Sequence, residues 1–452
     1  MGPSTRRADE AVPVPRVVRE DLPRQATKRY PATANKGDSD ERGIGGGNLA
    51  LRVRRNHKVS APRCVVIGTG RVAGGFLAPL LRAAGWEPIL VGRNPAVIET
   101  INEGSGLWLN VAGDPLGSRW IDGVRAVSSD DPNLSGFVAG ADLVATAVGP
   151  YSLHEVGRVL APLLQARLQT CGDPVNIVAF ENHRRAPEIL TRGLLEGHTP
   201  LAEHIGRWIG VGGAAVWRAV SCREITPSGI RYDANGVDEC YVDAASLVPG
   251  APLDGSIPGL ELVRAFEDRI VEKLWVFNAG HAAAAYLGWH AGCETLDKAM
   301  AHEEIRATVS AVVREAQQAL EAYLAARPGS VPIPARRLGS ILDLYADPAL
   351  DDAIVRVARD PRRKLAADDR LVGPAGACLA AGMRPDALAR VIAAALAYGE
   401  ESDRQARDLR RELEFLEPEE VLSEVSTLDR NDELTRLVCQ RYYTFNWEEV
   451  AC

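Results

Sequence analysis

The sequence predicts an α/β fold in which a Rossmann-like, doubly wound and mostly parallel sheet precedes a mainly α-helical region. The first half alternates helical spacing with short β-rich runs, at residues 64–67, 88–91, 141–148 and 175–180. Beyond residue 259 the apolar spacing is dominated by helical patterns. We therefore divide the chain into a disordered basic extension (1–61), a dinucleotide-binding domain (62–255) and a helical substrate and catalytic domain (256–452).

The composition is that of an ordinary globular protein, with 452 residues of which 46% are hydrophobic and 25% are charged. No apolar run reaches the roughly 18 residues that cross a bilayer, and no apolar signal-peptide core stands at the start, so we expect a cytoplasmic protein with no membrane partner. The eight cysteines form no C-x-x-C pair and no cluster with the eight histidines. This spacing disfavours a disulfide framework and a structural zinc site, and no metal is expected.

Positive charge is concentrated at the start of the chain. Residues 1–60 hold 13 of the 52 Lys and Arg but only 7 of the 60 Asp and Glu, which leaves the rest of the chain acidic. An acidic body argues against nucleic acid as a partner. The basic stretch has mixed charges, several prolines and no sustained period of 2 or 3.6, so we expect it to be disordered.

The first β-rich run leads into a glycine turn and then into leucines at helical spacing. Strand, turn and helix in this order fit the dinucleotide-binding fingerprint. Gly68 permits the tight turn, Gly70 lets the backbone approach a pyrophosphate, and Ala73 allows close packing. The start of the following helix attracts the phosphates. We expect this turn, which also includes Arg71 and Val72, to bind the cofactor.

The second β-rich run ends at the position that governs the choice between NAD and NADP. An NAD site usually has Asp or Glu here to hold the ribose hydroxyls, whereas this chain has Gly92 followed by Arg93. A missing carboxylate removes repulsion toward a 2′-phosphate, and a guanidinium can bind one. We therefore favour NADP(H), with NAD(H) possible; in the alternative interpretation, Arg93 only points to solvent.

Two later runs are expected to end beside the cofactor, because ligands of a doubly wound sheet bind at the carboxyl ends of its strands. The run at residues 141–148 includes Ala147 and leads into Gly149 and Pro150, where glycine lets the chain pass close to the cofactor. The run at residues 175–180 ends in polar residues, of which Asn182 is the candidate for a carboxamide near the reacting carbon.

A polar triad stands in the otherwise apolar stretch of residues 272–290. On a helix, Lys273, Asn278 and His281 lie at about 0°, 140° and 80°, so they share one face. Burial penalises the charged form of lysine, so we expect Lys273 to have a lowered pKa and to act as a base. Asn278 could donate to a substrate oxygen that gains negative charge, and His281 could orient that oxygen. In the alternative, the lysine reaches water and the other two are satisfied core groups.

Five segments of the chain, taken together, point to one protein family. They read GTGRVAGGF, DLVATAVGP, VNIVAFEN, EKLWVFNAGHAAAAYLG and RVARDPRRKLAADDRLVGP. In this order they resemble the mannitol dehydrogenase family, the polyol-specific long-chain dehydrogenases, and within it the mannitol-1-phosphate 5-dehydrogenase branch. The resemblance implies a metal-independent, nicotinamide-dependent oxidoreductase with Lys273 as general acid/base. It further implies that Asn278 and His281 bind the reacting oxygen and that Asn182 completes an oxyanion pocket.

The last of these segments carries a basic cluster, formed by Arg359, Arg362, Arg363 and Lys364. Because guanidinium groups bind phosphate well, we expect Arg359, Arg363 and Lys364 to hold an anionic substrate group such as a phosphate. The alternative is a solvated helix end.

Two departures from the family pattern concern specificity. The branch has an Asp where this chain has Cys222, and the acid that favours NAD is absent. We therefore expect a dehydrogenase of a sugar, polyol or cyclitol phosphate, its exact substrate left open. An NAD-linked dehydrogenase of an unphosphorylated polyol, or a nucleotide-binding protein without catalysis, is the alternative.

Overall fold

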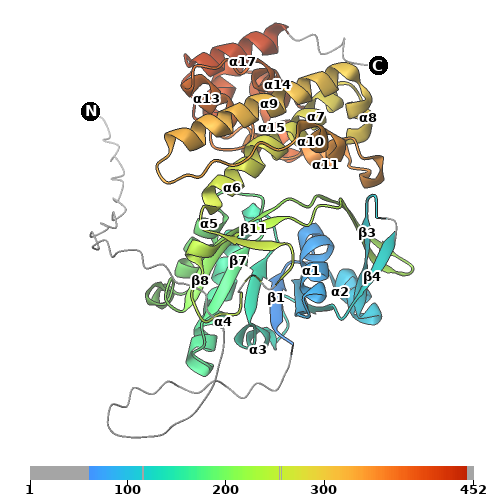
Figure 1. Cartoon of the computed structure of the whole chain (residues 1–452), viewed down its shortest axis with the longest axis vertical. Coiled ribbons are helices and arrows are strands. Elements are labelled where there is room, and N and C mark those ends of the chain that lie inside the picture. The colour runs from blue at the N-terminus through green and yellow to red at the C-terminus, as the bar shows by residue number, and fades with distance from the viewer. Residues whose placement is uncertain (1–60, 115–116, 254, 256, 445–452) are drawn as a thin grey trace, which may run out of the picture. The chain divides into compact units, whose positions relative to one another are not determined.

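The computed structural model describes residues 61–114, 117–253, 255 and 257–444, so the extension expected at residues 1–61 falls almost wholly outside them. Within the described residues the main sheet has eight strands in the order β12-β11-β8-β7-β6-β1-β2-β5 (Figure 1). Neighbouring strands are parallel except for β8 and β11. The strands are β1 (Arg63–Ile67), β2 (Glu87–Gly92), β5 (Arg125–Ser128), β6 (Leu143–Thr146), β7 (Val175–Ala179), β8 (Ile209–Val216), β11 (Cys240–Asp243) and β12 (Leu260–Val263). The predicted mostly parallel sheet is confirmed, and β12 extends it past residue 255, the predicted domain boundary.

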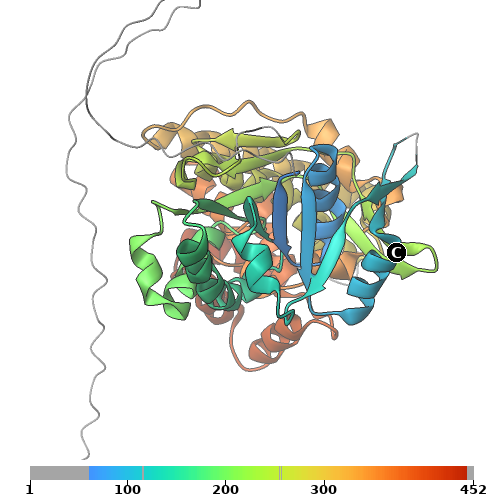
Figure 2. The same cartoon turned by 90° about the horizontal axis from the view of Figure 1, so that it is seen from below.

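Helices cover both faces of this sheet (Figure 2). Because side chains alternate along a strand, Val66 of β1 packs into one apolar core and its neighbour Val65 into another. The first core includes α1 (Ala78–Ala83) and α2 (Pro95–Gly104). The second includes α3 (Leu134–Ala139), α4 (Leu153–Thr170) and α5 (Ala186–Gly197). This is the doubly wound arrangement that the continuous apolar runs predict.

A smaller sheet, whose strands lie outside the β-rich runs predicted from the sequence, packs beside the glycine turn. Its strand order is β4-β3-β10-β9, with β4 (Ser118–Asp122), β3 (Gly106–Val111), β10 (Gly229–Ala234) and β9 (Val220–Thr226). Tyr232 of β10 is fully buried, and its hydroxyl donates to the carbonyl of Thr69 at 3.2 Å. A Cβ at Gly74 would lie 2.1 Å from the Tyr232 ring, so this sheet supports the turn by direct contact.

The helical part of the chain is organised around α7 (Asn278–His290), which is buried along most of its length. Small residues allow other helices to approach it closely. A Cβ at Gly280 would meet Val313 of α9 (Glu303–Ala326) at 2.7 Å, and one at Gly288 would meet Ala299 of α8 (Leu296–Ala301) at 2.6 Å. The single helix predicted at residues 272–290 is instead the end of α6 (Phe266–Glu272), a π-helical turn η5 (Lys273–Phe277), and then α7. The π turn changes which side chains share a face.

The remaining elements connect and cover these parts. The helices are η1 (Ala73–Leu77, π-helical), η2 (Pro150–Ser152), η3 (Thr199–Glu203), η4 (Ala244–Ser246), α8 (Leu296–Ala301), α9 (Glu303–Ala326), α10 (Leu338–Tyr345), η6 (Pro348–Leu350), α11 (Ile354–Ala358), α12 (Pro361–Lys364), α13 (Val372–Ala380), α14 (Asp386–Leu396), α15 (Arg404–Leu413), α16 (Pro418–Ser426) and α17 (Glu433–Thr444). Over the described ranges, no helix combines the length and apolar character required to cross a membrane.

Candidate active site

A cavity of about 590 Å³ lies where the carboxyl ends of the parallel strands face the helical part of the chain. Its sheet-side wall consists of the turns that follow β1, β6 and β7, together with residues 214 and 216–220. Its helical-side wall consists of Lys273, Phe277, Asn278, His281, Ala282, Arg356, Val357, Arg359, Asp360, Arg363, Lys364 and Arg370. All predicted site residues line the cavity except Gly68, Ala73 and Arg93. Its size suits a small-molecule site.

The glycine turn of the sheet-side wall has two kinds of glycine. Gly68 has φ +131°, and a Cβ there would lie 2.5 Å from the carbonyl oxygen of Ala147, so only glycine fits. At Gly70 the nearest such atom is 3.6 Å away, and at Gly149, with φ +89°, nothing lies within 4 Å. Gly68 thus closes the turn, while Gly70 and Gly149 line the cavity and have no close contact at the Cβ position. This backbone surface fits the diphosphate of a dinucleotide.

The end of β2 explains the missing acid. Gly92 is buried, and a Cβ there would lie 2.5 Å from the side chain of Thr69, so a side chain at this position would have to displace Thr69. Arg93, the predicted partner of a 2′-phosphate, is exposed and does not line the cavity. Ala73 is buried in the first turn of η1, as close packing of that turn requires.

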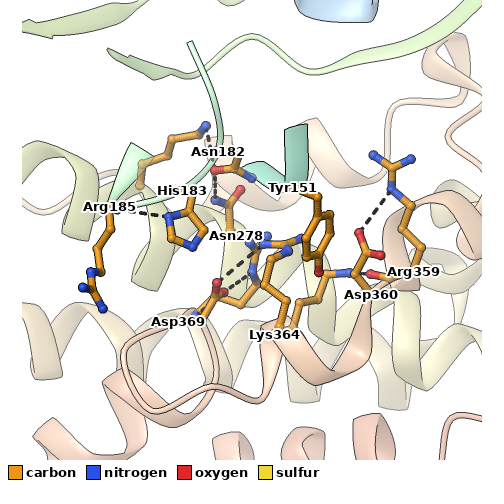
Figure 3. A network of polar contacts seen from close by, with 12 residues as sticks. Tyr151, Asn182, His183, Arg185, Asn278, Arg359, Asp360, Lys364 and Asp369 are labelled. Carbon is orange, nitrogen blue, oxygen red and sulfur yellow. Dashed lines mark hydrogen bonds and ion pairs between the residues drawn. The ribbon is translucent and has the colours of Figure 1, made fainter. Parts of the chain in front are cut away.

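The π turn brings the predicted catalytic side chains together. The backbone N–H of Asn278 donates to the carbonyl of Lys273, a bond that spans five residues. In a regular α-helix these two side chains would be about 140° apart, and the inserted residue reduces that separation. Both then reach Asn182, which follows β7. Its Oδ1 accepts from Lys273 Nζ at 3.2 Å. The same oxygen accepts from Asn278 Nδ2 at 3.0 Å (Figure 3).

Lys273 is only 6% exposed. Burial, with a smaller contribution from the nearby guanidinium of Arg370, lowers the pKa of Lys273 to about 7. The amine can therefore take up or release a proton near neutrality. The alternative in which this lysine reaches water does not describe the structure.

His281 is held by a carboxylate that the sequence analysis did not identify. His281 Nε2 lies 3.2 Å from Oδ2 of the buried Asp352, which also pairs with Arg356 at 2.6 Å. Although burial opposes ionisation, His281 and Arg356 lower the pKa of Asp352 to about 2, whereas burial lowers the pKa of His281. A neutral imidazole beside a carboxylate places its proton on Nε2 and leaves Nδ1 for a ligand. Among the described residues, no group of three or more His, Cys, Asp or Glu side chains is arranged so that it could hold a metal ion.

Glu181, next to Asn182, is a second acid that sequence reasoning passed over. Its carboxylate accepts from Thr146 Oγ1 at 2.8 Å and from the backbone N–H of Val148 at 3.0 Å. Burial raises the pKa of Glu181 to about 7, against hydrogen bonds from Val148, Thr146 and Gly149. Glu181 thus joins the end of β7 to the turn after β6, both of which belong to the sheet-side wall.

The residues of the basic cluster have different surroundings, and one of them, Arg362, lies outside the cavity. Arg362 pairs with Glu412 at 2.6 Å and with Glu424 at 3.2 Å, and it does not line the cavity. Lys364 is 3% exposed, and its Nζ donates to the carbonyl of Arg359. Burial, reinforced by Arg370 and Arg363, lowers the pKa of Lys364 well below its usual range. The alternative of a solvated helix end fits only part of the cluster.

Arg370 was not among the predicted site residues. It lines the cavity with Arg363 and Lys364, and we call these three residues the inner basic group. Arg370 is 4% exposed and bonds to Asp369 at 2.6 Å, while Arg363 lies 3.5 Å from the same acid. Arg370 Nη2 and Arg363 Nε are buried and have no hydrogen-bond partner among the described residues. This part of the cavity therefore holds donors that a bound anion can satisfy.

Comparison with known sequences identifies the family. The mannitol dehydrogenase Rossmann domain matches residues 62–241, and the mannitol dehydrogenase C-terminal domain matches residues 263–445. The chain belongs to the mannitol dehydrogenase family. As a member of that family it is an NAD(P)-dependent oxidoreductase that acts on a CH–OH group.

Individual relatives agree with this assignment. A mannitol-1-phosphate 5-dehydrogenase of Brevibacillus brevis is 34% identical over 380 residues, which cover 83% of this chain and 96% of that protein. The same enzyme of Thermoanaerobacter pseudethanolicus is 29% identical over 387 residues, with coverage of 84% and 97%.

Two solved structures of polyol dehydrogenases share the fold. Pseudomonas fluorescens mannitol 2-dehydrogenase with NAD and D-mannitol has a TM-score of 0.68 at 14% identity, covering 87% of this chain and 93% of that chain. A substrate-free D-sorbitol dehydrogenase has a TM-score of 0.63 at 16% identity, covering 86% and 94%.

Proposed function

We propose that this member of the mannitol dehydrogenase family interconverts a secondary alcohol and a ketone on a sugar, polyol or cyclitol phosphate, with Lys273 as general acid/base. The observation that carries the proposal is a buried lysine, with a pKa lowered to about 7, bonded to Asn182 on the wall of the cavity. A protein that only binds nucleotides has no need of such an amine.

In this proposal, a residue of this chain accepts the proton in oxidation and returns it in reduction. A bound nicotinamide supplies the hydride acceptor in oxidation and the hydride donor in reduction. In oxidation, neutral Lys273 takes the hydroxyl proton, so that the O–H bond breaks and an N–H bond forms while the carbinol becomes a carbonyl. In reduction, the protonated amine returns the proton to the same oxygen. This proton transfer requires no metal ion.

Two carboxamides stabilise the oxygen as its charge changes. Asn182 uses its Oδ1 to accept from Lys273 and Asn278, which leaves its Nδ2 to donate to the substrate oxygen. Asn278 spends one N–H on Asn182 and keeps a second. Donors fixed in this way stabilise a developing oxyanion without having to reorganise. Nδ1 of His281, as an acceptor, would bind a hydroxyl of the substrate other than the one that Lys273 deprotonates, and so orient the reacting carbon.

The substrate phosphate, in this proposal, binds between Arg363, Lys364 and Arg370. Asp369 is the carboxylate bonded to the two guanidinium groups, so the group has an excess of positive charge. A phosphate dianion would accept from the unpartnered Arg370 Nη2 and Arg363 Nε and would favour protonation of Lys364. The Brevibacillus brevis relative is named for a phosphorylated polyol, which supports the same class of substrate.

We further propose that NADP(H) is preferred over NAD(H). Support comes from Gly92, which lacks the carboxylate that would repel a 2′-phosphate and where any side chain would have to displace Thr69. The exposed Arg93 follows directly and supplies a positive charge at this end of the strand. Steady-state comparison of the two cofactors measures this preference.

The decisive experiment is the substitution Lys273→Ala. Loss of a positioned general base typically costs about 10²- to 10⁴-fold in turnover. We expect such a loss in the reduction of keto-sugar phosphates, followed by nicotinamide absorbance, while cofactor affinity measured by fluorescence titration stays close to that of the wild type. Turnover within a few-fold of the wild type would remove Lys273 from the mechanism. The wild type assayed with and without the substrate phosphate tests the substrate class.

A further inference from the structure

A second group of arginines lies at the glycine-turn end of the cavity. Arg71 comes from the turn itself, whereas Arg356 lies on α11 and Arg359 directly follows it. All three line the cavity together with Gly70 and Gly149. Residues from the sheet and from the helical part of the chain therefore meet around one space.

These arginines have little compensating negative charge. Arg71 has no ion pair among the described residues, and its Nε is buried without a hydrogen-bond partner. Arg359 is 59% exposed, and its nearest acid is Asp360 at 3.9 Å. Only Arg356 is firmly paired, to Asp352. Burial lowers the pKa of Arg71, and the charges of Arg356 and Arg359 lower it further, so the three guanidinium groups are close enough to repel one another.

This group is separate from the inner basic group that we assign to the substrate. Figure 3 shows Arg359 and Asp360 on one side of the network and Asp369 on the other, with Lys364 between them. Asp369 contacts both Arg363 and Arg370, whereas Arg359 lies near Arg71, which follows Gly70 in the glycine turn. The backbone of Gly70 and Gly149 lines the same cavity. The ligand expected on such a backbone surface is a dinucleotide diphosphate.

We infer that Arg71 and Arg359, with Arg356 beside them, bind the diphosphate of the cofactor, so that the helical part of the chain takes part in cofactor binding. The inference rests on the proposed function for its cofactor and reassigns Arg359 from the substrate to the cofactor. A diphosphate carries negative charge with several acceptor oxygens, which matches the unpaired guanidinium groups. It also removes the repulsion between arginines from the two parts of the chain.

The test measures cofactor binding by the Arg359→Ala variant. Arg359 is suitable because its side chain is exposed enough to be removed without leaving a cavity. Fluorescence titration with NADPH, with NADH and with ADP-ribose should show about tenfold weaker binding of all three ligands. The loss should be similar for NADPH and NADH, since both carry the diphosphate. The matched control is Arg404→Ala, which removes one positive charge from a side chain that is 88% exposed and outside the cavity. It should bind all three ligands as the wild type does.

Each of the following results would overturn the inference. Unchanged affinity of Arg359→Ala for all three ligands would remove Arg359 from the cofactor site, and a raised KM for the phosphorylated substrate alone would return it to the substrate. Loss of affinity for NADPH but not NADH would assign it to the 2′-phosphate. If the wild type bound no dinucleotide, the proposed function would fail together with the inference. Normal turnover and cofactor binding in both variants would sink the inference alone.

Discussion

The two walls of the cavity are built on different physical principles. The sheet-side wall presents backbone at Gly70 and Gly149 among mostly apolar side chains, with Arg71 and Arg218 as its basic groups. The helical-side wall presents buried ionisable groups, among them Lys273, Lys364 and Arg370. Under the proposals above, cofactor binding draws on both walls, whereas the charged groups that act on the substrate lie mainly on the helical-side wall.

Among the predictions that test the difference between the two walls, the largest change in kcat/KM is expected for the Arg370→Met variant. The substitution removes a guanidinium with an unpartnered Nη2 while it keeps an unbranched side chain to fill the space. Charge-assisted bonds from arginine to phosphate are strong, so kcat/KM for a phosphorylated substrate should fall about 100-fold. The measurement is steady-state kinetics on a phosphorylated substrate and on its unphosphorylated counterpart.

The unphosphorylated counterpart is the internal control for Arg370→Met. Its kcat/KM should change far less, because the lost contact is with the phosphate. An equal fall for both substrates would assign Arg370 to the reaction centre and would leave the charge of the helical-side wall without a ligand. Thermal unfolding of the variant would show whether Asp369, left with Arg363 alone, disturbs the fold.

The two walls also differ in how far the sequence predicts them. Gly68, Gly70 and Gly149 stand within a few residues of a strand end, so the local order of strand, turn and helix is enough to place them. Asn182 is found in the same way. The parallel sheet was predictable for the same reason, because its apolar runs are contiguous, whereas the smaller sheet pairs β3 with β10 from distant parts of the chain.

The helical-side wall depends on contacts between distant residues. Asp352 reaches His281 from 71 residues away, and Lys273 reaches Asn182 from 91 residues away. The spacing of Lys273 and Asn278 is read correctly only when the π turn is known, since a regular helix separates them by about 140°. Family resemblance supplied what periodicity could not, but it did not indicate Arg370 or Glu181.

A second prediction concerns the sheet-side wall and contrasts two glycines. Gly68→Ala forces a Cβ to within 2.5 Å of the Ala147 carbonyl oxygen at φ +131°, so it should destabilise the fold by about 1–3 kcal/mol. Gly70→Ala meets only an ordinary contact at 3.6 Å and should leave the unfolding temperature nearly unchanged. Its methyl group nevertheless enters the space that a diphosphate would occupy. We therefore expect Gly70→Ala to weaken cofactor binding by roughly tenfold, the amount that a lost charge-assisted hydrogen bond costs.

Calorimetry of both glycine variants measures the unfolding temperature, and fluorescence titration measures the cofactor affinity, so the two effects can be told apart. If Gly70→Ala bound cofactor as the wild type does, the open surface at this turn would not be the diphosphate site. If Gly68→Ala unfolded at the temperature of the wild type, the close contact with Ala147 would not constrain the turn.

The smallest effect, and the one most specific to Lys273, is on the pH dependence of kcat/KM. Because neutral Lys273 is the base in oxidation, kcat/KM for oxidation should rise about tenfold per pH unit below a midpoint near 7 and level off above it, and reduction should fall above the same midpoint. A neighbouring cation makes protonation of the amine harder, so Arg370→Met should raise the pKa of Lys273 and move the midpoint upward. Glu181 also has a pKa raised to about 7, but by burial and without a contribution from Arg370. A midpoint that stays in place in Arg370→Met would therefore belong to Glu181 and not to Lys273, whereas one that moves upward identifies the amine as the titrating base.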